Sequence, residues 1–310
     1  MNQNCKKEIK IAVVGDVHNQ WEEEDGIALK RLGADLVLFV GDYGNEAVEI
    51  VEAIAALDLP KAAVFGNHDA WYTMTHWGRK HCPYDPEKEN WVRRQMDLLG
   101  EAHVGYRKRD FPEFGLTVVG SRPFTWGGPE WRDGEFYQKW FGVNSFEDST
   151  RRMVEAVESS TQNTVIFLGH TGPTGLGDAP EDPCGRDWKP IGGDYGDPDF
   201  AAAIAQTRAL GKQVPLVTFG HMHHNLRHTK TCRRKCVRVG SEGTVYLNAA
   251  RVNRIEDTQT GKQRNFSLVT LEGGRVSEAQ FVWVDPHFHI AEAEILYRQP
   301  RPVIEAVPMV

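Results

Sequence analysis

Five short clusters of aspartate, asparagine and histidine are spread along the chain, and a glycine directly precedes each of them. The clusters are Asp16-Val17-His18, Asp42, Asn67-His68-Asp69, His170 and His221-Met222-His223. A mixed set of carboxylate, amide and imidazole ligands suits Mn, Fe, Zn, Co or Ni, whereas an oxygen-only set suits Mg or Ca. The predicted ligands are Asp16, His18, Asp42, Asn67, His170, His221 and His223. Seven ligands exceed the need of one four-coordinate ion, so the set indicates two ions bridged by one carboxylate.

The spacing inside the first and last clusters supports chelation. Their outer residues are two positions apart, and on extended backbone such side chains point to the same side. Any one cluster alone is more often structural: a turn after a strand, a helix cap formed by Asn67 or Asp69, or a satisfied core histidine. Five clusters in one ordered series favour a common metal site over five unrelated structural roles.

Short apolar runs must position these clusters, because one ends at each of them. The runs cover residues 9–14, 35–40, 60–65, 163–168 and 214–219. Residues 22–32 and 46–57 between the first three runs are predicted helices. Strand–helix–strand alternation predicts a mostly parallel sheet, in which functional groups gather at the carboxyl ends of the strands.

The remaining pattern predicts a single domain with two packed sheets and helices on both outer faces. Further helices are expected over 86–99, 145–159 and 199–210, with short strands in 101–119. Strands over 244–248, 265–271 and 275–284 are expected to be antiparallel. We expect one domain over residues 1–290, followed by an extension, 291–310, whose role the sequence does not indicate. The Gly- and Pro-rich segment 171–198 is too long to be a mere connector.

Composition excludes several classes of function. The net charge of −7 over 310 residues argues against a nucleic-acid partner, since such proteins normally carry a basic excess. There is no run of 18 apolar residues, so no membrane span is expected. The start of the chain is too short and polar for a secretory signal. The five cysteines form no CxxC pair, and Cys232 and Cys236 are expected to stay reduced, as in a cytoplasmic protein of a bacterium or a plastid stroma.

The ordered motifs resemble those of the calcineurin-like metallophosphoesterase superfamily. The family pattern DxH, GD, GNH[DE], GH and GHxH is matched by GDVH, GD, GNHD, GH and GHMH, and the resemblance spans residues 11 to about 250. It implies an α/β fold that is a four-layer α/β/β/α sandwich with two mixed sheets. More narrowly, GDYGNEAVE, GNHDAWYT and GHTGPTGLGDAPEDPCG resemble a cyanobacterial and plastid subgroup.

The resemblance also implies a role for each matched residue. The first metal would be held by Asp16, His18, Asp42 and His223. Asp42 would bridge to the second metal, which Asn67, His170 and His221 would complete. A hydroxide bridging the two ions would attack the phosphorus atom in line, because bound cations lower the pKa of water. His68 lies outside the ligand set and is the expected general acid for the leaving group.

One departure from the family pattern narrows the expected substrate. Phosphoprotein phosphatases have GDxxDRG, whereas this chain has Gly41-Asp42-Tyr43-Gly44-Asn45-Glu46. Asn45 can accept a hydrogen bond from His68 but adds no charge, and no arginine follows it. The expected substrate is therefore a small phosphorylated metabolite or a nucleotide, as a mono- or diester. A nuclease and a non-catalytic metal-binding scaffold remain alternatives.

Several basic and aromatic residues are candidates for contacting the substrate. Arg79, Lys80 and Arg122 are candidates for binding phosphate, although solvated surface charges are the commoner case. Trp71, Trp126 and Trp131 could stack on a base or a sugar, although packing in the core is commoner. The basic stretch 228–238 indicates a hairpin tip.

Overall fold

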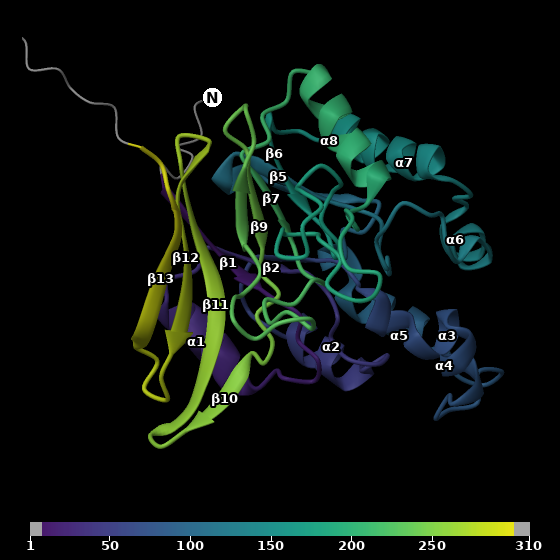
Figure 1. Ribbon diagram of the computed structural model, residues 1–310, viewed down its shortest axis with the longest axis horizontal. Coiled ribbons are helices and arrows are strands. Elements are labelled where there is room, and N and C mark those ends of the chain that lie inside the picture. The colour runs from purple at the N-terminus through teal and green to yellow at the C-terminus, as the bar shows by residue number, and fades with distance from the viewer. Residues whose placement is uncertain (1–7, 301–310) are drawn as a thin grey trace, which may run out of the picture.

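Two β-sheets lie face to face in the computed structural model, which describes residues 8–300 (Figure 1). The first sheet has seven strands in the order β13-β12-β11-β1-β2-β3, and β10 pairs with β11. Its strands are β1 (Glu8–Val14), β2 (Leu36–Phe39), β3 (Lys61–Ala63), β10 (Ile255–Thr258), β11 (Gly261–Glu272), β12 (Arg275–Val284) and β13 (Ile290–Arg298). β1, β2 and β3 are parallel, whereas β11 runs antiparallel to β1.

The second sheet has six strands in the order β4-β5-β6-β7-β9-β8. Its strands are β4 (Lys108–Phe111), β5 (Leu116–Gly120), β6 (Thr164–Leu168), β7 (Leu216–Phe219), β8 (Val237–Val239) and β9 (Val245–Asn248). The four central strands are parallel, and β4 and β8 are antiparallel edges. Both sheets are therefore mixed, as predicted.

Alternating residues along each central strand separate two hydrophobic cores. In β1, Ile11 and Val13 lie between the sheets with Ile166 and Leu168 of β6. The intervening residues of both strands face the helical layers instead. This period of two, with both faces buried, is typical of strands in the middle of a layered fold. It explains why these strands read as continuous apolar runs.

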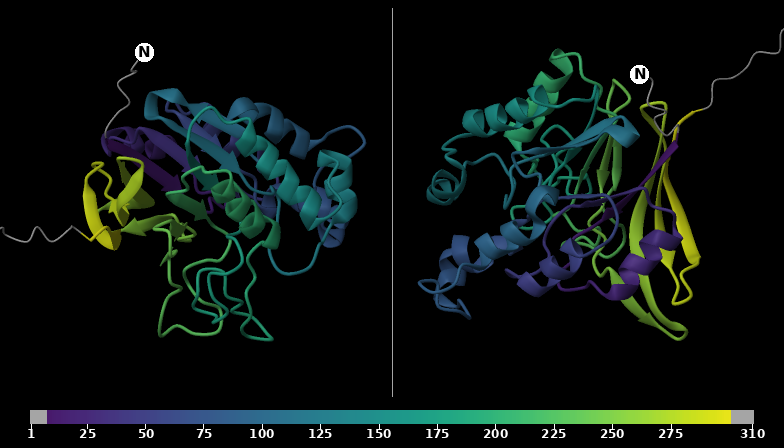
Figure 2. Two further views of the ribbon diagram at one scale, coloured as in Figure 1. Left: turned by 90° about the horizontal axis from the view of Figure 1, so that it is seen from above. Right: turned by 180° about the vertical axis from the view of Figure 1, so that it is seen from behind.

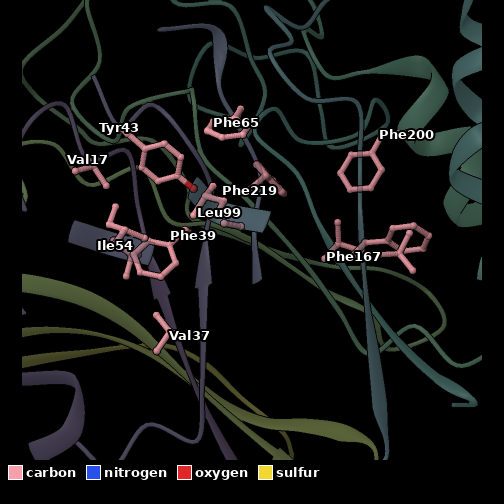
Figure 3. Close-up of a cluster of buried hydrophobic side chains, with 14 of the residues drawn as sticks. Val17, Val37, Phe39, Tyr43, Ile54, Phe65, Leu99, Phe167, Phe200 and Phe219 are labelled. Atoms are coloured by element: carbon pink, nitrogen blue, oxygen red, sulfur yellow. The ribbon is translucent and has the colours of Figure 1, made fainter. Parts of the chain in front are cut away.

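Helices cover the outer faces of both sheets (Figure 1). On the first sheet lie α1 (Glu23–Arg31) and α2 (Val48–Ala55), and α5 (Trp91–Leu99) packs against α2. On the second lie α7 (Phe146–Glu158) and α8 (Pro198–Ala209), where Phe200 and Phe167 contact each other with ring centroids 5.6 Å apart. Figure 3 shows these two rings and, nearer the first sheet, Phe39 and Tyr43. The predicted four-layer α/β/β/α sandwich is confirmed.

Several short elements differ from the expectation or were not predicted. The predicted helix over 86–99 begins only at residue 91. Three helices lie in the aromatic-rich regions: α3 (Trp71–Met74), α4 (His76–Lys80) and α6 (Gly134–Phe141). β13 begins at the last residue of the predicted domain and continues into the predicted C-terminal extension, whose last residues, 301–310, lie outside the described part of the chain. Among residues 8–300, no helix has the length and apolarity that a bilayer span needs.

Two long loops pack together beside the second sheet. Segments 171–198 and 222–237 lie side by side, which Figure 2 shows in its left view as the teal and green loops. The buried Arg234 joins them, because its guanidinium donates hydrogen bonds to the carbonyls of Pro180, Asp182 and Gly185. Arg234 thus anchors the basic stretch to the long loop, whereas residues 230–233 are exposed, as expected of a solvated turn.

Candidate metal centre

All seven predicted ligands lie at the carboxyl ends of parallel strands, and the two sheets contribute them jointly. Asp16, Asp42 and Asn67 follow β1, β2 and β3 of the first sheet. His170 follows β6, and the two histidines of the last cluster follow β7, in the second sheet. Two parallel-strand edges therefore meet at one place, and the structure brings all seven side chains together there.

One group of side chains surrounds His170. Its Nδ1 lies 2.8 Å from the carbonyl oxygen of Val40, which can only accept, so Nδ1 carries the proton and Nε2 presents a lone pair. Around Nε2 lie Asn67 Oδ1 at 3.0 Å, His221 Nδ1 at 3.2 Å and Asp42 Oδ1 at 3.4 Å. Nitrogen and oxygen atoms that converge on one point in this way are arranged as metal ligands are, so these residues fit a metal ion.

The second group lies on the other side of Asp42. His223 Nε2 is 3.1 Å from Asp16 Oδ2 and 3.2 Å from His18 Nε2. His18 Nε2 is in turn 3.8 Å from Asp42 Oδ2. Each oxygen of Asp42 therefore faces a different group, which is the arrangement that a bridging carboxylate requires.

Burial and charge hold three of these groups in the protonation states that bind metals, whereas the pKa of His223 is raised, because the hydrogen bond to Asp16 and the charges of Asp16 and Asp42 outweigh burial. Burial raises the pKa of Asp16, but the hydrogen bond from His223 and the nearby imidazoles outweigh it, and the pKa is lowered. The pKa of Asp42 is also lowered, since His170 and His68 outweigh burial. Burial and His170 lower the pKa of His221 to about 3. Two ionised carboxylates and a neutral imidazole result at neutral pH.

The backbone at the site is held in conformations that side-chain-bearing residues seldom adopt. His18, Asp42 and His221 have φ values of 44°, 52° and 66°. Such residues cost free energy and persist where the surrounding structure fixes them, often at functional sites. Here the carboxylates help to fix them, because Asp16 accepts a hydrogen bond from the backbone N–H of His221.

Two of the preceding glycines allow the ligands to approach closely. A Cβ on Gly66 would collide with Asp42 Oδ1 and with the ring of His170. A Cβ on Gly220 would collide with Asp16 Oδ1. Neither glycine has a positive φ, so the reason for glycine at both positions is space and not backbone conformation.

His68 lies beside the ligands at the edge of the site. Its Nδ1 is 2.6 Å from Asn45 Oδ1, which accepts the hydrogen bond that the sequence predicted. The two imidazoles of His68 and His18 meet edge to face at 5.0 Å. Since Nδ1 donates to Asn45, the other ring nitrogen is available to a substrate. His68 also falls with His18 and Asp42 in a group compact enough to hold an ion.

Asp69 organises the loops beneath the site, and the sequence indicated only a possible capping role for it. Its buried carboxylate accepts hydrogen bonds from the backbone N–H groups of Asp42, Tyr43 and Gly66. These three donors belong to the loops after β2 and β3, which carry two of the predicted ligands. Its place within the GNHD motif was the only signal that could have revealed it.

Of the predicted phosphate-binding residues, none lies against the ligands. Arg122 is 3% exposed and forms ion pairs with Asp197 and Asp199. Arg79 donates to the backbone carbonyls of Thr73 and Met74, and Lys80 is exposed. Of the predicted stacking residues, Trp71 and Trp126 lie beside His68, whereas the indole of Trp131 covers Arg122.

Comparison with known proteins places these features in a family. The calcineurin-like phosphoesterase family matches residues 9–225, which is more than half of the chain. No curated protein matches the chain.

The similar solved structures are distant ones. A protein from Thermus thermophilus is 14% identical with a TM-score of 0.45, over 93% of this chain and 99% of that one. A dimetal phosphatase from Danio rerio is 11% identical with a TM-score of 0.47, over 94% and 99%. An archaeal phosphodiesterase is 10% identical with a TM-score of 0.33, over 89% and 100%. The family match over residues 9–225 and the two-sheet fold agree, and the chain belongs to the calcineurin-like phosphoesterase family.

Proposed function

We propose that this protein is a dinuclear-metal hydrolase of a small phosphorylated metabolite or nucleotide, acting on a mono- or diester. The observation that carries the proposal is the convergence of carboxylate, amide and imidazole side chains on both sides of Asp42. Family membership supports phosphoester chemistry. The net charge of −7 supports a small-molecule substrate over a nucleic acid.

The proposed ligands divide into two sets that share one carboxylate. Asp16, His18, Asp42 and His223 would hold one ion, and Asp42, Asn67, His170 and His221 the other. The close distances within each set support this division. Mn, Fe and Zn match the mixed nitrogen and oxygen donors. When bound, two such ions would supply an activated water molecule and positive charge for the phosphoryl group.

His68 is the proposed general acid for the leaving oxygen. The hydrogen bond to Asn45 orients its ring, so that its Nε2 can give a proton to the leaving oxygen. Asn45 accepts without adding negative charge, and this distinguishes the site from the acid–histidine pair of the phosphoprotein phosphatases. The difference supports a small-molecule esterase over a protein phosphatase.

We also propose that the protein is cytoplasmic. Four cysteines within the described part of the chain, Cys82, Cys184, Cys232 and Cys236, are free thiols. Free thiols at this number are typical of a reducing compartment.

Metal analysis together with two substitutions tests the proposed function. Purified protein reconstituted with Mn is expected to bind two ions per chain and to hydrolyse members of a panel of phosphorylated metabolites. Asn67→Ala is expected to lose metal and activity, whereas His68→Ala keeps both ions and loses activity. The exposed His289 offers a control, and His289→Ala should change neither quantity.

The outcomes separate the alternatives. Fewer than one transition-metal ion per chain after reconstitution overturns the two-metal proposal. Two bound ions without hydrolysis of any phosphoester point to the scaffold. Hydrolysis of oligonucleotides in preference to every small ester points to the nuclease. A chromogenic monoester and diester pair, assayed in parallel, assigns the class of ester.

A further inference from the structure

Two indole side chains flank His68 on the side away from the predicted ligands. The ring of Trp71 stacks on the imidazole, with centroids 4.8 Å apart and an interplanar angle of 14°. The ring of Trp126 is 6.5 Å from the imidazole and 5.7 Å from Trp71. His68 thus lies between His18 and this pair of indoles, Trp71 and Trp126, which we call the tryptophan pair.

The tryptophan pair comes from both sheets, and each member is held in place. Trp126 follows β5, where Thr125 Oγ1 donates to Asp197 and accepts from the N–H of Gly127. Trp71 begins α3, whose Thr73 donates its N–H to the buried carboxylate of Glu46 at 2.6 Å. Positions fixed by buried hydrogen bonds allow an aromatic surface to select a ligand by shape.

Trp126 packs in part against the core of the helical layers, but core packing does not account for the position of Trp71 on the imidazole of His68. Trp131, by contrast, is covered by the buried Arg122, with the guanidinium 5.1 Å from its ring, and by Phe146. All three indoles are half-buried, but it is Trp71 and Trp126 that lie beside His68. Trp71 packs on His68, Trp126 and the edge of Trp77, which is itself 56% exposed. The tryptophan pair therefore places aromatic surface at the edge of the site.

The position of His68 determines what this surface would contact. A general acid must lie within hydrogen-bond reach of the leaving oxygen, and the ligands occupy the His18 side of the ring. The group carried by that oxygen then lies at the edge of the imidazole, next to which Trp71 and Trp126 present their rings. Indole faces favour a planar aromatic ring over a saturated ring of similar size, because ring quadrupoles and flat contact add to simple burial.

We propose that Trp71 and Trp126 form a leaving-group subsite that selects phosphoesters whose alcohol carries a planar aromatic or heteroaromatic ring. This inference rests on the proposed function, because His68 must act on the leaving group. The predicted metal centre would bind the phosphoryl group of any phosphoester, whereas the proposed subsite would determine which alcohol the ester carries. Aryl alcohols and nucleosides share the required flat ring and are separated by the experiment.

The test compares two esters that differ in the flatness of one ring. Benzyl phosphate and cyclohexylmethyl phosphate have primary alcohols of similar acidity, so both leaving groups depend on an acid. We expect the Mn-loaded protein to prefer benzyl phosphate. Trp126→Leu should lower kcat/KM for benzyl phosphate about tenfold more than for the saturated ester. Trp71→Leu should also lower kcat/KM more for benzyl phosphate than for the saturated ester. Because Trp71 stacks on His68, this variant is expected to lower kcat/KM for both esters as well.

Trp140→Leu is the matched control. Trp140 is also half-buried, but it contacts Phe136 and Arg93 in the helical layer, away from His68. This variant should leave the ratio of the two kcat/KM values unchanged. A second pair, a nucleoside 5′-monophosphate and ribose 5-phosphate, tells whether a base at the end of a sugar reaches the same surface.

A binding measurement keeps the inference separate from the proposed function. Benzylphosphonate and cyclohexylmethylphosphonate cannot be hydrolysed, and titration calorimetry gives their affinities even for an inactive protein. Equal affinities in the parent protein, or equal losses for both ligands in Trp126→Leu, overturn the subsite. If both esters are hydrolysed at rates that do not change when Trp71 or Trp126 is replaced, the subsite is overturned, whereas the proposed phosphoesterase function is retained.

Discussion

Asn45 determines the orientation of His68 through a single hydrogen bond. The 2.6 Å contact fixes which ring nitrogen faces the site. An aspartate would provide the same acceptor with an added charge, whereas an alanine would provide none. Substitutions of Asn45 can therefore separate the effect of orienting His68 from the effect of a negative charge beside it.

Asn45→Ala should therefore slow the reaction only where the leaving group needs a proton. We expect kcat for an alkyl phosphoester to fall about tenfold or more, with a smaller change for a p-nitrophenyl ester, whose leaving group needs no acid. Asn45→Asp should restore most of the loss. Steady-state kinetics on both esters checks this, and an equal loss on both would show that Asn45 supports the fold or the metals instead.

At Gly66, the requirement is for space beside two ligands. Gly66→Ala places a methyl group where Asp42 Oδ1 and the His170 ring lie, so one of them must move. We expect the variant to retain its fold and to lose at least one ion per chain, together with most of its activity. Metal analysis by emission spectrometry checks the prediction.

The control for this substitution is Gly134→Ala. Gly134 also lacks a positive φ, and the nearest atom to its added Cβ would be Trp131 Nε1 at 3.3 Å. The methyl group requires only a small shift of the Trp131 side chain at the start of α6, away from the predicted ligands, so metal content should be unchanged. Two ions in both alanine variants would mean that the ligands adjust and that the glycine is not required for metal binding.

At the scale of elements, a buried ion network joins the long loop to the second sheet. Arg122, directly after β5, pairs with Asp197 and Asp199 around the start of α8. The rings of Trp131, Tyr137 and Phe146 surround its guanidinium at 5.1–5.5 Å. Removing one partner from such a network leaves buried charge without compensation.

Arg122→Met should therefore destabilise the protein strongly. We expect the free energy of unfolding to fall by about 3–5 kcal/mol, measured by urea denaturation with fluorescence detection. Arg132→Ala removes a pair whose side chains are 49% and 72% exposed and should cost less than about 1 kcal/mol. Similar losses in the two variants would contradict a structural role for Arg122.

The same elements show what could be predicted from sequence and what could not. β1, β2, β3, β6 and β7 were predictable because burial on both faces makes each an apolar run, and a glycine and a polar cluster end it. α3 and α4 have four and five residues, too short for a helical period to emerge. β13 is exposed on both faces for most of its length, so its sequence has no alternation.

The gathering of the predicted ligands at one place could also be predicted from the sequence, for a physical reason. Metal ligands are limited to a few residue types, and their local spacing is visible along the chain. The role of Arg122 depends on carboxylates about 75 residues away, and that of Asp69 on backbone N–H groups of two loops. Such tertiary partners have no local signature, so an arginine beside an aromatic stretch was open to a phosphate-binding interpretation.

At the scale of the whole molecule, β13 forms an edge of the first sheet, although the sequence predicted that the domain ends at residue 290. β13 pairs with β12 from Glu278 to Val284, at the edge opposite β3, whereas the predicted ligands follow β1, β2 and β3 in that sheet. Removal of residues 290–310 would leave β12 paired only with β11, with the backbone groups of its other side unpaired, and unpaired edges promote association between chains.

A chain that ends at residue 289 should keep its metals and its kcat/KM within about twofold, since the predicted ligands follow β1, β2, β3, β6 and β7 and none lies on β13. It should also melt at a lower temperature and elute from a sizing column as larger species at high concentration. Loss of the two ions in this truncated protein would instead place β13 within the predicted domain.

The pH dependence of global stability offers a final test, through a histidine outside the site. His103 is 2% exposed and neither ring nitrogen has a hydrogen-bond partner within the described residues. Burial, with a smaller effect from Arg107, lowers its pKa from 6.5 to about 3. Below pH 6.5 the unfolded chain binds a proton at His103 that the folded chain does not bind. The stability of the folded protein that depends on neutral His103 is therefore complete above pH 6.5 and declines as the pH falls towards 3.

His103→Leu should remove this part of the acid sensitivity. Between about pH 7 and about pH 5 the parent protein should lose about 2 kcal/mol more of its unfolding free energy than the variant does. Urea denaturation of both proteins at the two pH values measures the difference, and all other titrating groups cancel because both proteins contain them. The exposed His289 serves again as control, since His289→Leu should follow the parent. Parallel losses in the parent and in His103→Leu would mean that water or a local opening lets His103 take up its proton in the folded protein.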